Sequence, residues 1–218
     1  PGRFYIYPRN FEGGAFISSD YRRIFALDVS ASWRWFAERK RSIAKFSVSP
    51  RWRASNRLMV IPRVENEHKT DNVGFADLLG DSVIFGVRNV NTVTNTLTVK
   101  YIFTRLMSLS FRARHYWSAA AYKNYFLLNE AGRLENIEYN SNKNVNYNAF
   151  NIDMIYTWQF LPGSELSVVW KNSIYTQGNI IANDYFEDWQ LVADAAQINS
   201  FSVKAIWFID YRSVLGKK

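Results

Sequence analysis

Apolar and polar residues alternate one by one along most of this chain. Between residues 24 and 36 every second residue is apolar or aromatic, and the residues between them include Asp28, Ser30 and Arg34. Successive side chains of a β-strand point to opposite faces, so the pattern predicts a strand with one apolar and one polar face. The same alternation predicts about nine strands in all, at residues 4–17, 23–36, 42–54, 57–67, 83–103, 105–118, 147–160, 165–176 and 199–212.

The length of these runs and the distribution of charge separate two kinds of all-β protein. A water-soluble β-sandwich also alternates, but its strands usually have about 5–6 residues, whereas the runs here continue for about 9–13 residues. Strands of about 9–11 residues cross a bilayer when tilted. The apolar positions carry no Asp, Glu, Lys or Arg, which fits a lipid-facing surface, where a cation costs about 2–4 kcal/mol at the midplane. We predict an all-β fold, an antiparallel transmembrane β-barrel.

The polar positions are densely charged, which would disrupt a packed core but is ordinary inside a membrane barrel. They include the acids Asp28, Glu65, Asp153 and Asp210. We expect the basic residues to line the lumen: Arg34, Lys45, Arg51, Arg53, Arg63, Lys100, Arg112, Arg114, Lys171 and Lys204. A basic lumen would attract anionic solutes, or its cations would pair with interior carboxylates and plug it.

Short and long connections alternate along the chain. Tight turns are predicted around Ser19–Asp20, Ser55–Asn56, Thr104–Arg105 and Leu161–Ser164, and long external loops near 67–82, 118–146 and 177–198. Outer-membrane barrels have short periplasmic turns and longer external loops, so the tight turns are expected to face the periplasm. Aromatic residues gather near both ends of the strands, as in the interfacial belts of membrane proteins. The lipid-facing belt is predicted to contain Trp33, Trp35, Trp52, Tyr101, Phe103, Trp117, Trp158, Phe160, Trp170, Trp207 and Tyr211.

An odd number of strands is unusual, because single-chain bacterial barrels have even numbers and an open edge is costly in lipid. The chain also starts at Pro1 without a signal peptide. We therefore expect residues 1–218 to be the C-terminal portion of a larger, even-stranded barrel.

Composition narrows the class of protein further. Aromatic residues make up 17% of the 218 residues, which excludes a disordered chain, and no apolar run approaches the ~20 residues of a membrane-spanning helix. The absence of cysteine excludes disulfides and thiolate metal sites. The net charge of +8 suits anionic lipid or nucleic acid. Nucleic acid is not expected as a partner, because the basic residues alternate into a lumen instead of forming an exposed stripe.

Candidate chemistry is sparse. An aromatic and acidic loop could contact glycans, or could form a short helix over the barrel mouth; its residues are Asp184, Tyr185, Glu187, Asp188 and Trp189. The turn from Glu38 to Arg41 could meet lipopolysaccharide phosphates or be a solvated turn. His68 has acidic neighbours and His115 lies at an apolar position, but no catalytic, phosphate-loop or metal motif is present. We expect no enzyme activity, no catalytic residue, no metal and no cofactor.

Six short stretches together resemble a known family. They are FSVSPR at 46–51, VIFGVRN at 83–89, TVKYIF at 98–103, FNIDMIY at 150–156, LPGS at 161–164 and NSFSVKAIWFIDY at 199–211. They resemble the C-terminal barrel of an uncharacterised family of Bacteroidota outer-membrane proteins, in which the barrel follows a module similar to family 9 carbohydrate-binding domains. The resemblance implies a cell outer-membrane location and a missing upstream half, and it transfers no catalytic residue. The tail after Tyr211 departs from the usual barrel ending.

These observations lead to one expected function and two alternatives. We expect a non-enzymatic barrel that anchors or partners an envelope complex, for glycan handling or surface-protein assembly. Its partners would be membrane lipid, lipopolysaccharide and other outer-membrane proteins. The alternatives are a diffusion or uptake channel for small or anionic solutes and, more remotely, an outer-membrane hydrolase.

Overall fold

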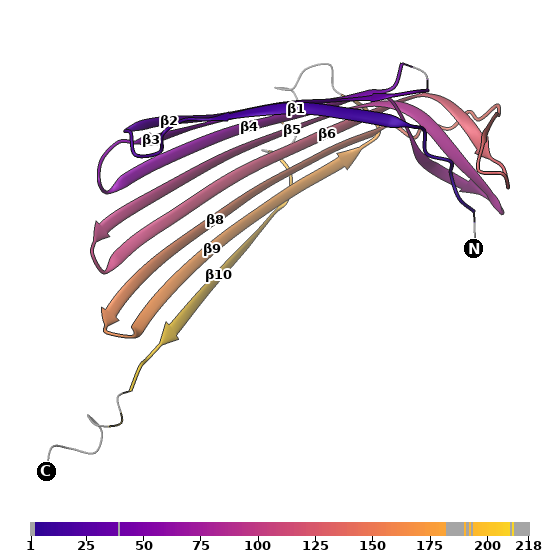
Figure 1. Ribbon diagram of the computed structural model, residues 1–218. Helices are drawn as coiled ribbons and strands as arrows, with labels where there is room; N and C mark the ends of the chain where they lie inside the picture. The colour runs from indigo at the N-terminus through magenta and orange to yellow at the C-terminus, as the bar shows by residue number, and fades with distance from the viewer. Residues whose placement is uncertain are drawn as a thin grey trace, which may run out of the picture.

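The chain forms one antiparallel β-sheet of ten strands (Figure 1). A computed structural model describes residues 3–38, 40–181, 190, 192, 194–209 and 211. The strands are β1 (Asn10–Ser18), β2 (Phe25–Phe36), β3 (Ser42–Arg53), β4 (Leu58–Leu79), β5 (Ser82–Thr104), β6 (Met107–Leu128), β7 (Leu134–Asn136), β8 (Val145–Leu161), β9 (Ser164–Gly178) and β10 (Gln197–Ile206). The predicted all-β antiparallel class is confirmed.

Each long strand pairs with the next long strand along the chain, in the order β1-β2-β3-β4-β5-β6-β8-β9-β10, and the short β7 pairs with β6. This is a simple meander, so the nine long strands correspond to the nine predicted runs. The sheet is strongly curved, and β1 and β10 form its two free edges among the described residues (Figure 1). No helix among those residues is long and apolar enough to span a membrane.

The strands are staggered in one direction across the sheet. The cross-strand row that begins at Leu58, the first residue of β4, passes through Tyr101 and Tyr156 and reaches β9 at Val168, past its first residue Ser164. Successive hairpins are therefore displaced along the strands. Such a stagger is the geometric counterpart of strands tilted by about 35–45° in a barrel.

The four tight connections are present at one end of the sheet. Residues 19–24, 54–57, 105–106 and 162–163 link consecutive strands there. In the last of them Gly163 has a φ of 75°, a left-handed conformation that glycine adopts without steric cost. Of the predicted long loops, the one near 177–198 agrees with a connection between Gly178 and Gln197.

The prediction of a long loop near 67–82 was wrong. β4 continues to Leu79 and β5 begins at Ser82, so only a two-residue turn separates them. The loop predicted at 118–146 is likewise shorter, because β6 extends to Leu128 and β8 begins at Val145. β5 has 23 residues, which at ~3.3 Å per residue gives ~76 Å, far longer than a bilayer requires.

The extra length forms a separate layered region, which we call the tip: residues 70–79, 82–90 and 119–128. A bulge at Asp71, whose φ is 48°, separates the tip from the rest of the sheet. On one face of the tip, Val73, Val87 and Phe126 form a buried cluster with Tyr5 packed against it. The predicted strand at 4–17 therefore starts late, because Tyr5 packs against the tip and pairing with β2 begins at Asn10.

The opposite face of the tip is covered by the connection between β6 and β8. Tyr125 donates a hydrogen bond to the Ser141 carbonyl at 2.9 Å, and the Tyr122 backbone N–H donates to Asn144 Oδ1 at 2.8 Å. The ring of Tyr122 occupies the position that a side chain at Gly86 would need. The tip is thus a small core with cover on both faces of the sheet.

Candidate functional site

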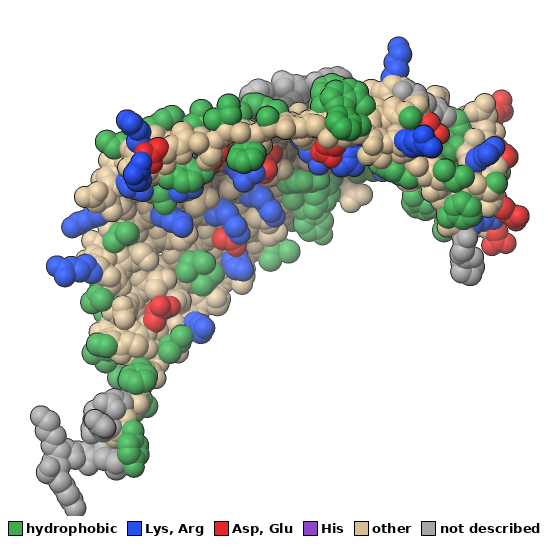
Figure 2. Space-filling view, in the orientation of Figure 1, with side chains coloured by type: hydrophobic (Ala, Val, Ile, Leu, Met, Phe, Trp, Pro, Cys, Tyr) green, Lys and Arg blue, Asp and Glu red, His purple; other side chains and the backbone are tan. Residues whose placement is uncertain are grey.

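All ten basic residues predicted to line a lumen lie on one face of the sheet. The register places them in shared cross-strand rows, such as Arg114 opposite Asn151 and Lys204 opposite Ser167. We call this the polar face. Figure 2 shows Lys and Arg side chains gathered with fewer Asp and Glu in the hollow of the curved sheet. Curvature and charge pattern therefore agree: the polar face is the concave one.

Ion pairs join neighbouring strands across the polar face. Glu67 Oε2 lies 3.1 Å from Lys45 Nζ, and its Oε1 lies 2.7 Å from Lys69 Nζ. Arg34 pairs with Glu12 across β1 and β2. Arg63 pairs with Glu65 along β4 at 2.7 Å. Much of the charge on this part of the face is therefore balanced locally.

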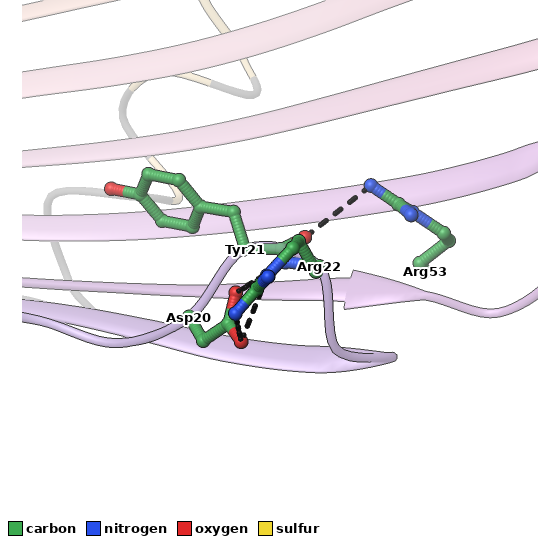
Figure 3. Close-up of polar contacts among 4 residues, drawn as sticks. All are labelled: Asp20, Tyr21, Arg22 and Arg53. Atoms are coloured by element: carbon green, nitrogen blue, oxygen red, sulfur yellow. Dashed lines mark hydrogen bonds and ion pairs between the residues drawn. The ribbon is translucent and has the colours of Figure 1, made fainter.

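The tight-turn end of the polar face is organised by the first hairpin (Figure 3). Arg22 and Asp20 form a fork with two 3.0 Å contacts, Nε to Oδ1 and Nη2 to Oδ2, and Arg53 donates to the Tyr21 carbonyl at 3.4 Å. The hydrogen bonds from Arg22 hold the pKa of the Asp20 carboxyl below its usual range. The guanidinium carbon of Arg51 lies 4.3 Å from the centre of the Tyr21 ring. This turn therefore holds two of the predicted lumen cations, Arg51 and Arg53.

Two of the hollows on the polar face differ in charge. The larger, of about 670 Å³, has hydroxyl groups from Ser47, Thr92 and Thr94 among its walls, together with the ion-paired residues Lys45 and Glu67. The smaller, of about 260 Å³, lies over β6, β8 and β9 and is lined by Arg112, Arg114, Asn151, Asp153, Lys171, Asn172 and Ser173. The first is locally balanced in charge and the second is cationic.

The opposite face, which we call the apolar face, carries no Asp, Glu, Lys or Arg in the described strands outside the tip. Nine of the predicted belt residues lie on it by register: Trp33, Trp35, Trp52, Tyr101, Phe103, Trp117, Trp158, Phe160 and Trp170. Near the tight turns, Trp158 packs edge-on against Phe160 at 5.8 Å, and Phe160 against Trp207 at 5.4 Å. Trp33 and Trp35 lie near the other end, 6.2 Å apart.

Trp207 and Tyr211 lie beyond the last strand, which ends at Ile206. Both side chains are exposed. The glycan-contact residues Asp184, Tyr185, Glu187, Asp188 and Trp189, together with Asp210 and Arg39, lie outside the described residues.

Amide groups, which the sequence analysis overlooked, border the apolar face away from the tight turns. Trp117 lies there but is only 8% exposed, and its Nε1 donates to Asn146 Oδ1 at 2.9 Å. The prediction that Trp117 belongs to an exposed belt was therefore wrong. His115 is 2% exposed, and its Nε2 lies 3.2 Å from Asn148 Oδ1. Trp170 Nε1 similarly donates to Asn199 Oδ1 at 3.0 Å.

Among the described residues, His68 does not form the carboxylate pair considered from the sequence. His68 lies in β4 on the face opposite Glu67, since neighbouring strand residues point to opposite sides. Glu67 is instead held by two lysines. Among the described residues, no group of three or more His, Cys, Asp or Glu side chains could hold a metal ion.

The sequence analysis placed Arg41 in a turn open to lipid phosphates, but in the structure Arg41 is buried. Its side chain is 4% exposed, and its guanidinium carbon lies 4.1 Å from the centre of the Phe36 ring and 4.8 Å from that of Tyr7. The cation therefore packs between aromatic rings, which attract it through their quadrupoles.

Sequence reasoning missed several charged residues of the polar face, among them Glu12, Glu67 and Lys69. Glu12 lies in a strand whose alternation is broken by two glycines, and Glu67 and Lys69 fall in the segment predicted as a loop. The alternation of Glu65, Glu67 and Lys69 at period two was the available signal. It continues the polar positions of the preceding residues without a break.

An ionic contact holds the β6–β8 connection on the tip. Lys143 Nζ lies 2.6 Å from Asp77 Oδ2, and Tyr139 donates its hydroxyl proton to the same oxygen. Hydrogen bonds from Lys143, Tyr139 and the Leu78 backbone lower the pKa of Asp77 to about 2. The ionised carboxylate is thus stabilised in the folded protein.

Acidification is expected to loosen this connection. Since the folded pKa of Asp77 is depressed from 3.8 to about 2, its stabilising contribution is present above pH ~4 and is lost as the pH falls toward ~2. Cleavage of residues 129–144 by pepsin should therefore increase over that range. Asp77→Asn should already be cleaved faster at pH ~4, relative to an Asp81→Asn control in the neighbouring turn. Equal cleavage of the two variants throughout would contradict the assignment.

Comparison with known proteins gives one family. The model of a family described as Domain of unknown function (DUF5916) matches residues 1–218. Neither the curated proteins nor the solved structures contain a match to the chain.

Proposed function

Because the chain belongs to the DUF5916 family, whose description names no activity, we propose its function from the two faces of the sheet. We propose that it is an integral β-barrel of the cell outer membrane, without enzyme activity, that anchors or joins an envelope complex handling glycans or assembling surface proteins. The observation that carries this proposal is a single curved sheet with an uncharged, ring-rich outer face and a charged inner face.

The dimensions of the apolar face support a membrane location. Along β8 about ten residues separate Asn148 from Trp158, and along β5 about ten separate Asn91 from Tyr101. Ten residues at ~3.3 Å, tilted by about 45°, cover ~23 Å, close to the ~25 Å apolar band of outer-membrane barrels. Aromatic rings and amides lie at its limits, as expected at headgroup level.

Closure of the barrel is part of the proposal. The free edges β1 and β10 expose backbone N–H and C=O groups, each of which costs several kcal/mol in hydrocarbon if left unpaired. We infer that further strands of the same polypeptide pair with them to give a larger, even-stranded barrel of which this is the C-terminal part. From the family resemblance we also propose a Bacteroidota source and a preceding module similar to family 9 carbohydrate-binding domains.

The tip supports the role in a complex. It extends beyond the span that lipid would cover, and its hairpin exposes Phe75, Leu78 and Leu79. Exposed apolar groups on a region with its own core favour a contact with another protein. Lipid and lipopolysaccharide around the barrel, and other outer-membrane proteins at the tip, are the proposed partners.

Extraction and co-purification test the proposal. The full-length protein should remain with membranes until detergent is added, and partners recovered in mild detergent should be reduced by Leu78→Asp with Leu79→Asp. The matched control is Asn56→Asp with Leu106→Asp, which adds the same two carboxylates at exposed tight-turn positions away from the tip. Protein that stays monodisperse in buffer without detergent would exclude the proposed location.

A channel for small or anionic solutes is the second candidate. It is favoured by Lys100, Arg114 and Lys204, which lie on the polar face with no acidic partner among the described residues. Planar-bilayer recording separates the two functions. For an anchor with a plugged lumen we expect no steady current, whereas a steady, anion-selective current would establish the channel instead.

A further inference from the structure

The smaller hollow on the polar face is lined by three cations and one acid. It measures about 260 Å³, and Arg112, Arg114 and Lys171 stand around one acid, Asp153. Arg112, Asp153 and Lys171 share a cross-strand row, while Arg114, Asn151 and Ser173 form the adjacent row. Side chains in adjacent rows on the same face are close enough to act on one ligand.

The single carboxylate does not balance the three cations. Asp153 Oδ2 lies 2.9 Å from Arg112 Nη2, and Oδ1 lies 4.0 Å from Lys171 Nζ. Arg114 has no acidic partner among the described residues, and its side chain is exposed. The hollow therefore keeps a local excess of positive charge, with guanidinium donors that Asp153 does not use.

The larger hollow provides a comparison within the same face. There Lys45 and Lys69 are both bound to Glu67, and Arg63 is paired with Glu65. Its charge is nearly balanced, so the larger hollow does not share the cationic excess of the smaller one.

We propose that the smaller hollow binds the phosphate or carboxylate group of a small solute. A guanidinium presents parallel N–H donors that match two oxygens of such a group. Arg114 and the unused donors of Arg112 would bind the oxygens, and Lys171 would add a point charge from β9. The inference rests on the proposed function, because it requires the polar face to enclose water.

Binding of inorganic phosphate to the full-length protein in detergent micelles tests this site. Titration calorimetry should give saturable binding that weakens about tenfold or more in Arg112→Gln with Arg114→Gln, since the variant loses the charged donors to the phosphate oxygens. Asp153→Asn should bind phosphate several-fold more tightly, because it removes the competing carboxylate. A purely structural role for Asp153 would not give that gain.

The control is Arg57→Gln with Arg105→Gln, which removes the same charge at exposed tight-turn positions and should leave binding unchanged. Competition by acetate would add carboxylates to the accepted ligands. Three results would overturn the site: no saturable binding, equal weakening of binding by the control pair, or displacement of bound phosphate by chloride as effectively as by added phosphate. Detergent-dependent extraction of the same samples reports separately on the membrane location, so failure of the site and failure of the proposed function are distinguishable.

Discussion

Leu97→Arg is expected to destabilise the protein in a bilayer by about 2–4 kcal/mol, the cost of a cation near the midplane of a lipid-facing surface. Leu97 lies on the apolar face, opposite Pro62 and Ala113, and is 39% exposed. The substitution would place its charge among acyl chains, far from the aromatic rings at either interface. The free energy of unfolding of the full-length protein from liposomes, followed by tryptophan fluorescence in guanidinium, measures the effect.

Thr94→Arg is the matched control in the same strand. It introduces the same side chain on the polar face, opposite Glu65 and Tyr116, where water and a carboxylate are available. Its expected cost is below about 1 kcal/mol. Equal effects of the two substitutions would show that the faces do not differ in environment, and the membrane proposal would fail.

Phe126→Ala is expected to destabilise the tip by about 3–5 kcal/mol, the usual cost of removing a buried phenyl ring. Phe126 is the large side chain of the cluster with Val73 and Val87, beneath Tyr5. The ten strands share one sheet, and the described residues of the tip have cover on both of its faces. Hydrogen exchange should therefore rise at residues 70–90 and 119–128 while the strands near the tight turns stay protected.

Phe75→Ala controls for loss of an aromatic ring in the same region. Its side chain is 53% exposed, so the expected change is within about 0.5 kcal/mol. Uniform loss of protection over the whole sheet in Phe126→Ala would contradict an independently stabilised tip.

The sequence predicted both faces of the sheet well because one chemical rule governs each strand outside the tip. Charged residues at one parity and uncharged residues at the other are readable from period two alone. The register later placed residues as distant as Arg34 and Lys204 on the same face. No knowledge of strand pairing was needed for that assignment.

The tip was misread because this rule stops at Lys69. Beyond it, in the segment predicted as a loop near 118–146, the neighbouring residues Ala119 and Ala120 are both buried, so apolar residues are covered at both parities. The bulge at Asp71 also shifts the pairing. A pattern without alternation was taken for a loop, when it marks strands buried on both faces.

The surroundings of individual side chains could not be predicted from the sequence either. Trp117 and Arg41 occupy positions that agree with the pattern, yet each is buried by contacts with partners distant in the chain. The pairing of Glu12 with Arg34 and of Asp153 with Arg112 depends on register. These contacts distinguish a balanced hollow from a cationic one.

The amino-acid pattern by itself determined that this chain forms long antiparallel strands with one uncharged and one charged face, because side-chain direction in a strand follows directly from residue parity. Only the tertiary structure decided which charges meet, where the sheet gains a second and third layer, and which hollows keep excess cations. Those properties depend on register, stagger and the path of connecting segments, and each of these is set by contacts between residues far apart in the sequence.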